Sequence, residues 1–412
     1  MNALHIRKNT ISIILLTAVL ISAVFTGVVN ALNSNTTHTL KANLSNVRAY
    51  APAVSPSHIS YAVDGGVLFA GGPQGWGEVK TPDNIIVGAV AVNNSNEQTL
   101  YVGAANEMTL YRSTDAGQHW LRIPLNKNIV GGVTDIAVDN SQRLVYVGTD
   151  NAGIFRLRDV GSSMILSGQT PLDQPVLDVA ADSTGHGLAF VRTANKLYRA
   201  ENGGLTWVTV DNLNSLPTAL AISNGQPATV YVGTTDRGLL KSNDGQNWTT
   251  ANAGLGLVPG SRLHVDALAA DPVQSNVLYV ATSYLYGSTE VHQSPVGVAL
   301  STDNAQKWTA LYNNDKTAIA ALLPVTGETG AVYALTNQSR TPLALGKATE
   351  FVAKAAPQSV NATSSVFDSG ILAWIVAGLA ALALLFAIGN DLRSRRTPTS
   401  KPLAPGMVRN SR

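Results

Sequence analysis

A short apolar segment with one aromatic residue recurs along the chain, and each copy is followed by small or polar residues. The aromatic residues of the seven copies are Phe69, Tyr101, Tyr146, Phe190, Tyr231, Tyr279 and Tyr333. Their spacings are 32, 45, 44, 41, 48 and 54 residues, a period of roughly 42 residues between positions 58 and 348. The short apolar runs predict β-strands, and the fixed period predicts a repeat architecture.

Further strands are predicted around each copy. Six copies follow a small, apolar segment that suits a strand crowded near a central axis: 87–93, 134–139, 177–182, 218–223, 266–271 and 319–324. A third strand follows at 109–113, 153–157, 196–200, 238–242 and 297–301, and a fourth begins near a Trp. Four short strands per period predict an all-β, seven-bladed β-propeller over residues 58–348. Six or eight blades stay open, because the first and last repeats are degenerate.

The turn before the fourth strand has a recurring polar pattern. Residues Ser113 to Trp120 read S-x-D-x-G-x-x-W, with Asp115 and Gly117 at the other fixed positions. An Asp can accept backbone N–H bonds within its own turn, Gly permits positive φ, and Trp provides a large apolar surface. The partial copies keep Asp159 and Gly161, then Asn202, Gly204 and Trp207, then Asp244, Gly245 and Trp248, and finally Ser301, Asp303 and Trp308.

This turn resembles the Asp-box, or bacterial neuraminidase repeat, and the resemblance covers residues 58–348. Similar repeats occur in sialidases, sortilin-type receptors, xyloglucan-cleaving glycosidases and the photosystem II stability/assembly factor. The resemblance implies a β-propeller in which the boxes determine the fold and lie on the face opposite the ligand.

An enzymatic function finds little support in the sequence. The resemblance to sialidases implies an arginine of an R-I-P motif before the first box, but Arg122-Ile123-Pro124 follows a box on a predicted outer strand. A glycosidase needs two carboxylates flanking the bond. Asp139, Asp182 and Asp271 end three inner strands. They could line the channel mouth or cap turns, and we expect them to cap turns.

Binding residues are expected in loops between second and third strands. The segment 283–296 inserts about ten residues into the sixth repeat and carries Tyr284, Tyr286, Glu290 and His292, an aromatic and polar set typical of binding surfaces. Asp150, Asp236 and Arg237 occupy equivalent loops. We therefore expect a binding, scaffold or assembly module for a protein or glycan, with a sialidase-like or other glycoside hydrolase as the alternative.

Two hydrophobic segments flank the repeats. Arg7 and Lys8 precede an apolar run at 11–29, which predicts a signal peptide cleaved after Ala31 or an uncleaved anchor. The uncharged run 370–389 is long enough for a transmembrane helix. Six basic residues in the tail at 390–412 predict a cytoplasmic C-terminus and an extracytoplasmic propeller in the cell membrane. Linkers are expected at 32–57 and 349–369.

Composition limits the kinds of chemistry and of partner to expect. The chain has no cysteine, which excludes disulfides and thiolate chemistry. The basic residues lie mainly at the two ends, so the segment between them is mildly acidic, which argues against a nucleic-acid partner. Neither metal-ligand spacing among the histidines nor a phosphate-binding loop is evident, so we expect no metal and no cofactor.

Overall fold

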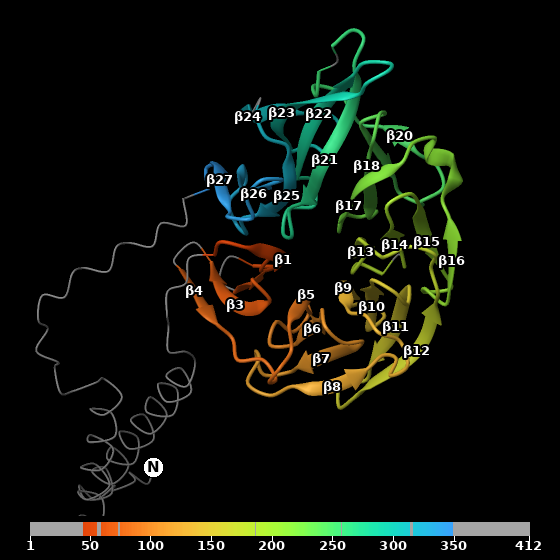
Figure 1. Cartoon of the computed structure of the whole chain (residues 1–412), viewed down its shortest axis with the longest axis vertical. Coiled ribbons are helices and arrows are strands. Elements are labelled where there is room, and N and C mark those ends of the chain that lie inside the picture. The colour runs from red at the N-terminus through yellow and green to blue at the C-terminus, as the bar shows by residue number, and fades with distance from the viewer. Residues whose placement is uncertain are drawn as a thin grey trace, which may run out of the picture. The chain divides into compact units, whose positions relative to one another are not determined.

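The computed structural model describes residues 44–348, apart from 56–58, 73–74, 186, 257 and 314–315. Here 27 strands form seven antiparallel sheets around a central axis, as in a propeller (Figure 1). The predicted all-β, seven-bladed fold is therefore confirmed. Across the described residues, no helix is long and apolar enough to span a membrane. The hydrophobic segments 11–29 and 370–389 lie outside the described residues.

The first four blades each contain four strands in chain order from the axis outwards. Blade 1 contains β1 (Val47–Ala51), β2 (Ser60–Asp64), β3 (Val67–Gly72) and β4 (Gly75–Glu78). Blade 2 contains β5 (Val87–Val92), β6 (Leu100–Ala104), β7 (Thr109–Ser113) and β8 (Leu121–Pro124). Blade 3 contains β9 (Val133–Asp139), β10 (Leu144–Thr149), β11 (Ile154–Asp159) and β12 (Met164–Thr170). Blade 4 contains β13 (Asp178–Ala181), β14 (Ala189–Arg192), β15 (Leu197–Glu201) and β16 (Thr206–Thr209).

The last three blades follow the same order. Blade 5 contains β17 (Pro217–Ser223), β18 (Thr229–Thr234), β19 (Leu239–Ser242) and β20 (Thr249–Thr250), and the 3-10 helix η1 (Asp211–Leu213) precedes it. Blade 6 contains β21 (Arg262–Ala270), β22 (Leu278–Tyr286), β23 (His292–Ser301) and β24 (Thr309–Asn313). Among the described residues, blade 7 has three strands, β25 (Ile319–Pro324), β26 (Ala331–Thr336) and β27 (Leu343–Gly346).

The propeller begins earlier than the expected boundary at residue 58. Strand β1 lies inside the segment 32–57 that we expected to be a linker, and it forms the inner strand of blade 1. The second strand is β2 with Tyr61, whereas Phe69 lies in the third strand, β3. With Tyr61 in place of Phe69, the first spacing becomes 40 residues instead of 32. The sequence did not reveal β1, because Arg48 and Tyr50 make it unlike the other inner strands, which are small and apolar.

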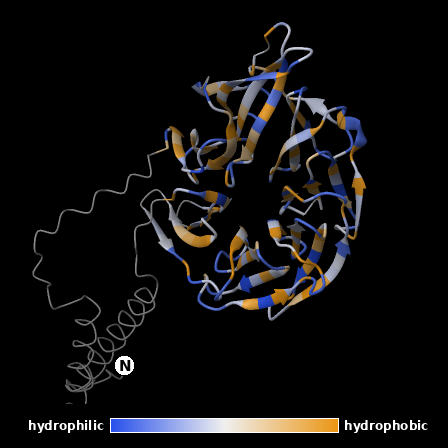
Figure 2. Cartoon of the chain, in the orientation of Figure 1, coloured by the Kyte–Doolittle hydropathy of each residue, from blue (hydrophilic) through white to orange (hydrophobic). Residues whose placement is uncertain are grey.

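Blades 1 and 7 close the ring. The N–H of Val47 donates to the carbonyl of Arg340 at 3.1 Å, and the Thr326 hydroxyl donates to the carbonyl of Ala53 at 2.7 Å. Trp76 and Tyr333 belong to the apolar cluster between these two blades. Figure 2 shows apolar and polar residues interspersed along the strands around the whole ring.

The aromatic residue of each second strand packs into the contact between blades. All seven are at most 3% exposed: Tyr61, Tyr101, Tyr146, Phe190, Tyr231, Tyr279 and Tyr333. The Tyr146 ring in blade 3 meets the Trp207 ring of blade 4 edge-on at 5.7 Å between centroids, and its hydroxyl donates to the carbonyl of Gly203 at 3.0 Å. Phe190 meets Trp248 of the following blade in the same way, at 6.4 Å. One blade therefore rests on the third-to-fourth-strand turn of the next.

A basic residue within three positions of the end of several third strands adds a polar contact to the following blade. Arg112 of blade 2 donates from Nε to Asp159 of blade 3 at 2.7 Å, and both side chains are buried. Arg156 of blade 3 donates to the carbonyl of Gly203 at 2.7 Å, and Lys241 of blade 5 donates to the carbonyl of Asn304 at 2.9 Å.

Three turns have the hydrogen bonds that the Asp-box pattern predicts. In blade 2, Ser113 Oγ donates to Asp115 Oδ1 and accepts the N–H of Gly117, both at 2.8 Å. Asp115 Oδ1 accepts the N–H of His119 at 2.9 Å, and Trp120 Nε1 donates to the carbonyl of Lys80 at 2.9 Å. The box that contains Ser301, Asp303 and Trp308 is built alike.

The box in blade 5 is one residue shorter but keeps this network. Ser242 Oγ donates to Asp244 Oδ1 at 2.8 Å and accepts the N–H of Gly245 at 2.9 Å, and Asp244 Oδ1 also accepts the N–H of Asn247 at 2.8 Å. Ser242 lies six positions before Trp248, whereas Ser113 lies seven before Trp120, so the turn tolerates the loss of one residue.

Asp159 does not form an Asp-box. It is the last residue of β11 and pairs with Met164 across a tight hairpin. Its carboxylate accepts the Tyr101 hydroxyl at 2.6 Å, Arg112 Nε, and the N–H of Gly161. The expected box at Asp159 and Gly161 is therefore wrong, because this hairpin is shorter than the box in blade 2.

Two glycine substitutions test the contact between blades. Gly204 has φ +80°, and an added Cβ would lie 2.4 Å from the Tyr146 ring. Gly161 has φ +86°, but an added Cβ would meet nothing within 4 Å. We expect Gly161→Ala to cost about 1–2 kcal/mol from backbone strain. Gly204→Ala should cost about 1–3 kcal/mol more, because it also overpacks the contact between blades 3 and 4.

Urea denaturation of both variants checks this difference. Equal midpoints for the two variants would contradict a tight contact between Tyr146 and the following turn.

Candidate binding face

Strand direction divides the loops between two faces. Inner strands begin on one face, here named the upper face, where the connections between blades and the loops between second and third strands lie. The opposite, lower face has the turns between third and fourth strands, and therefore the Asp-boxes. Every residue predicted to bind lies in an upper-face segment, in β22–β23 or in the β10–β11 and β18–β19 loops.

The insertion in blade 6 is a strand extension and not a long loop. Strands β22 and β23 pair as far as Tyr286 and His292, so only residues 287–291 form the turn. Tyr286 and His292 stack with ring centroids 5.4 Å apart, and Tyr286 is 45% exposed. Glu290 is exposed in the turn, whereas Tyr284 packs against the apolar cluster between blades 5 and 6. This hairpin projects from the ring in Figure 1.

The other three predicted residues form hydrogen bonds that hold loops in place. Asp150 Oδ1 accepts the N–H of Gly132 at 2.9 Å, which fixes the connection between blades 2 and 3. Asp236 Oδ1 accepts the Ser215 hydroxyl at 2.5 Å. Arg237 donates from Nη1 to the carbonyl of Leu213 at 2.9 Å. The structure therefore does not bring Asp150 together with the hairpin residues, but it places Asp236 in a pocket.

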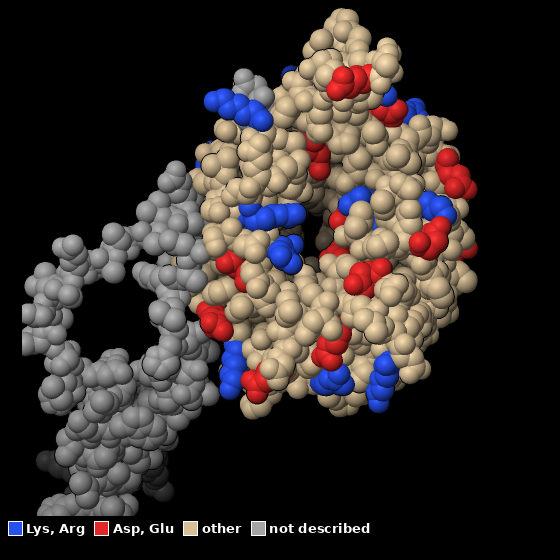
Figure 3. Space-filling view, in the orientation of Figure 1, with Lys and Arg blue, Asp and Glu red and all other residues tan. Residues whose placement is uncertain are grey.

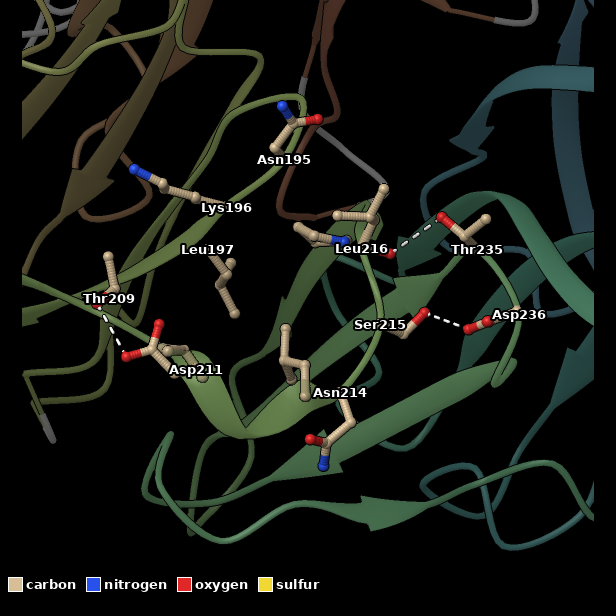
Figure 4. Close-up of a pocket in the computed structure, with 13 residues that line it drawn as sticks. Asn195, Lys196, Leu197, Thr209, Asp211, Asn214, Ser215, Leu216, Thr235 and Asp236 are labelled. Carbon is tan, nitrogen blue, oxygen red and sulfur yellow. Dashed lines mark hydrogen bonds between the residues drawn. The ribbon is translucent and has the colours of Figure 1, made fainter.

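A pocket of about 390 Å³ opens on the upper face between blades 4 and 5 (Figure 4). It is lined by residues 195–197, 209–211, 213–217 and 235–236. Leu197 and Leu213 are buried, and Leu216 is 50% exposed. Apart from Asp236, the sequence analysis did not identify these residues as a site, because they come from the β14–β15 loop, the β16–β17 connection and the β18–β19 loop and have no repeated pattern.

Three acidic residues lie near the start of inner strands. Asp135 in β9 accepts the N–H of Val179 in blade 4 at 2.6 Å, and Asp178 in β13 pairs with Arg192. Asp266 in β21 accepts the Ser283 hydroxyl at 2.6 Å and Gln293 Nε2 at 2.7 Å. The sequence analysis predicted these strands but considered only the aspartates at their ends as candidate catalytic residues.

Two of these carboxyl groups hold a proton more tightly than usual. Burial, aided by the Asp178 charge, raises the pKa of Asp135 to about 7. Burial raises the pKa of Asp266 to about 6. Figure 3 shows basic side chains beside the central hole near β1 and acidic side chains over β21 and on the opposite edge. A carboxyl group with a pKa near 7 can donate a proton at neutral pH.

The carboxylates first considered for catalysis cap turns, as expected. Asp139, Asp182 and Asp271 are at most 4% exposed and lie at the lower ends of inner strands. Each accepts hydrogen bonds from residues two or three positions later. Arg122 lies on the outer strand β8 and pairs with Glu107 at 2.7 Å. Within the described residues, no cluster of three metal-ligating side chains occurs.

Fold and turns together define a seven-bladed β-propeller with Asp-box turns and an upper face free of them. No family model matches the chain. The chain is 26% identical over 197 residues to a curated xyloglucanase of Hypocrea jecorina (strain QM6a), which covers 44% of this chain and 23% of that enzyme.

Solved structures give the same fold. The GH74 xyloglucanase from Xanthomonas campestris matches with a TM-score of 0.54 and 18% identity, over 71% of this chain and 51% of that chain. YCF48, solved bound to D1 peptide, matches with a TM-score of 0.51 and 14% identity, over 71% of this chain and 91% of that chain. The chain thus spans about half of the bacterial xyloglucanase but is similar in extent to YCF48.

The raised pKa of Asp135 predicts a pH dependence of stability. An unfolded Asp has a pKa near 3.9, so the folded protein binds this proton more tightly and loses stability as pH rises from about 4 through about 7. We expect a lower urea midpoint at about pH 8 than at about pH 5, and Asp135→Asn should flatten the slope. Asp266 contributes in the same direction up to about pH 6.

The matched control is Asp83→Asn, because Asp83 carries an exposed carboxylate in the connection before β5. An unchanged slope in Asp135→Asn would contradict the assignment.

Proposed function

We propose that this protein is a membrane-anchored, extracytoplasmic binding module whose upper face docks a protein partner. The observation that carries the proposal is a repeated apolar exposure at the connections between blades. Five successive connections each present one exposed aliphatic side chain: Ile86 at 51%, Val130 at 89%, Leu177 at 44%, Leu216 at 50% and Val258 at 49%. Single exposed aliphatic residues are ordinary, but a ring of them on one face is typical of an interaction surface.

A protein fits this surface better than a glycan. The five side chains are aliphatic, and the pocket beside Leu216 has no aromatic ring among its lining residues. The similarity to a single-propeller protein solved with a peptide supports the same class of partner. The anchor is supported by the uncharged run 370–389, which is followed by Arg393, Arg395 and Arg396.

Photo-crosslinking in intact cells tests the docking face. A photoreactive benzoylphenylalanine replaces Val130 or Leu216 on the upper face. The controls are Leu205, 54% exposed in a lower-face turn, and Ile165, 51% exposed on an outer strand. We expect a protein adduct from the upper-face positions alone. Equal adducts from all four positions, or none from the upper face, would overturn the proposal.

A second candidate is a glycoside hydrolase, favoured by the Asp135 carboxyl group with its pKa of about 7 beside Asp178. The sequence and fold similarity to xyloglucanases supports it. The purified full chain, in detergent, is incubated with xyloglucan and a fluorogenic sialoside. Under the protein-docking proposal we expect no turnover. Hydrolysis that Asp135→Asn lowers at least a hundredfold would establish the enzyme, because general acid catalysis contributes about that much.

A further inference from the structure

The pocket between blades 4 and 5 has an unbalanced set of charges. Lys196 is its one basic lining residue, and its Nζ lies 3.0 Å from Asp173 Oδ2, so Asp173 neutralises this charge. The two acidic lining residues are Asp211 and Asp236. Within the described part of the chain, neither carboxylate forms an ion pair with a basic side chain.

The partners of the two carboxylates are neutral. Asp236 accepts the Ser215 hydroxyl at 2.5 Å, and Asp211 accepts the Thr209 hydroxyl at 3.3 Å, as the dashed lines in Figure 4 show. The nearby Arg237 donates to the carbonyl of Leu213 and is not among the lining residues. The pocket therefore presents negative charge and hydrogen-bond acceptors that a cationic group would satisfy.

Apolar residues make up part of the pocket lining. Leu197 and Leu213 are buried, and Leu216 is half exposed at the mouth. A lysine or arginine side chain combines a methylene stem with a cationic head, and such side chains lay the stem along apolar surface. A volume of about 390 Å³ also suits a side chain with part of its backbone, for which the amides of Asn195 and Asn214 offer polar contacts.

We propose that this pocket binds a lysine or arginine side chain on an extended segment of the partner protein. The site rests on the proposed docking of a protein at the upper face and assigns it a chemical preference. Leu216, one of the five exposed aliphatic residues, joins the pocket to the wider docking surface.

Ligand-observed saturation-transfer NMR on the full chain in detergent tests this assignment. The probes are N-acetylated, amidated tripeptides Gly-X-Gly with X as arginine, lysine, norleucine or glutamate. We expect binding of the arginine and lysine probes, weaker at high salt. Norleucine keeps the stem without the charge, so it and glutamate should not bind measurably.

Variants test whether binding depends on the carboxylate charges of the pocket. Asp211→Asn combined with Asp236→Asn should weaken binding of the arginine probe about fivefold, which corresponds to two partly exposed ion pairs. Asp83→Asn, which removes an exposed carboxylate elsewhere on the upper face, should leave binding unchanged. Equal binding of the norleucine probe, or an unaltered affinity in the double variant, would overturn the assignment. Neither outcome affects crosslinking from Val130, so the two proposals fail separately.

Discussion

The contact between the second-strand aromatic ring of one blade and the turn of the next blade determines how the ring is built. Tyr146 shows it most fully, because its ring meets Trp207 while its hydroxyl bonds the backbone of Gly203. Such a contact requires a turn of fixed shape, and in blades 2, 5 and 6 the Asp-box hydrogen bonds supply that shape. Aromatic pairs with this geometry contribute beyond their buried area, and both Tyr146–Trp207 and Phe190–Trp248 form such a pair between blades.

Blade 3 shows how the contact survives when the box is lost. Its short hairpin lacks the box network, and Asp159 instead accepts both Tyr101 and Arg112 from blade 2. A buried ion pair replaces backbone hydrogen bonds at the same place in the ring. Removing either Arg112 or Asp159 alone would leave the other as an uncompensated buried charge, so these two residues depend on each other.

Under the proposed function, the same arrangement separates stability from recognition. The Asp-boxes and the turn-capping Asp139, Asp182 and Asp271 occupy the lower face. The upper face has the connections between blades, which vary in length and carry the exposed aliphatic residues, and it also has the blade 6 hairpin and the pocket. Loops on a rigid scaffold can change without disturbing the packing, which is why they commonly carry function.

The sequence by itself determined the repeat, favoured seven blades and located the boxes of blades 2, 5 and 6, because each depends on local spacing and residue type. It also placed Tyr286, Glu290 and His292 between the second and third strands of blade 6. It did not predict β1, because Arg48 and Tyr50 interrupt the apolar pattern of this inner strand, whose identity depends on pairing with β2. It could not find the pocket, because residues 195–197, 209–211, 213–217 and 235–236 meet only when blades 4 and 5 pack together. The raised pKa of Asp135 likewise arises from burial and from Asp178, 43 residues away, so only the tertiary structure decided it.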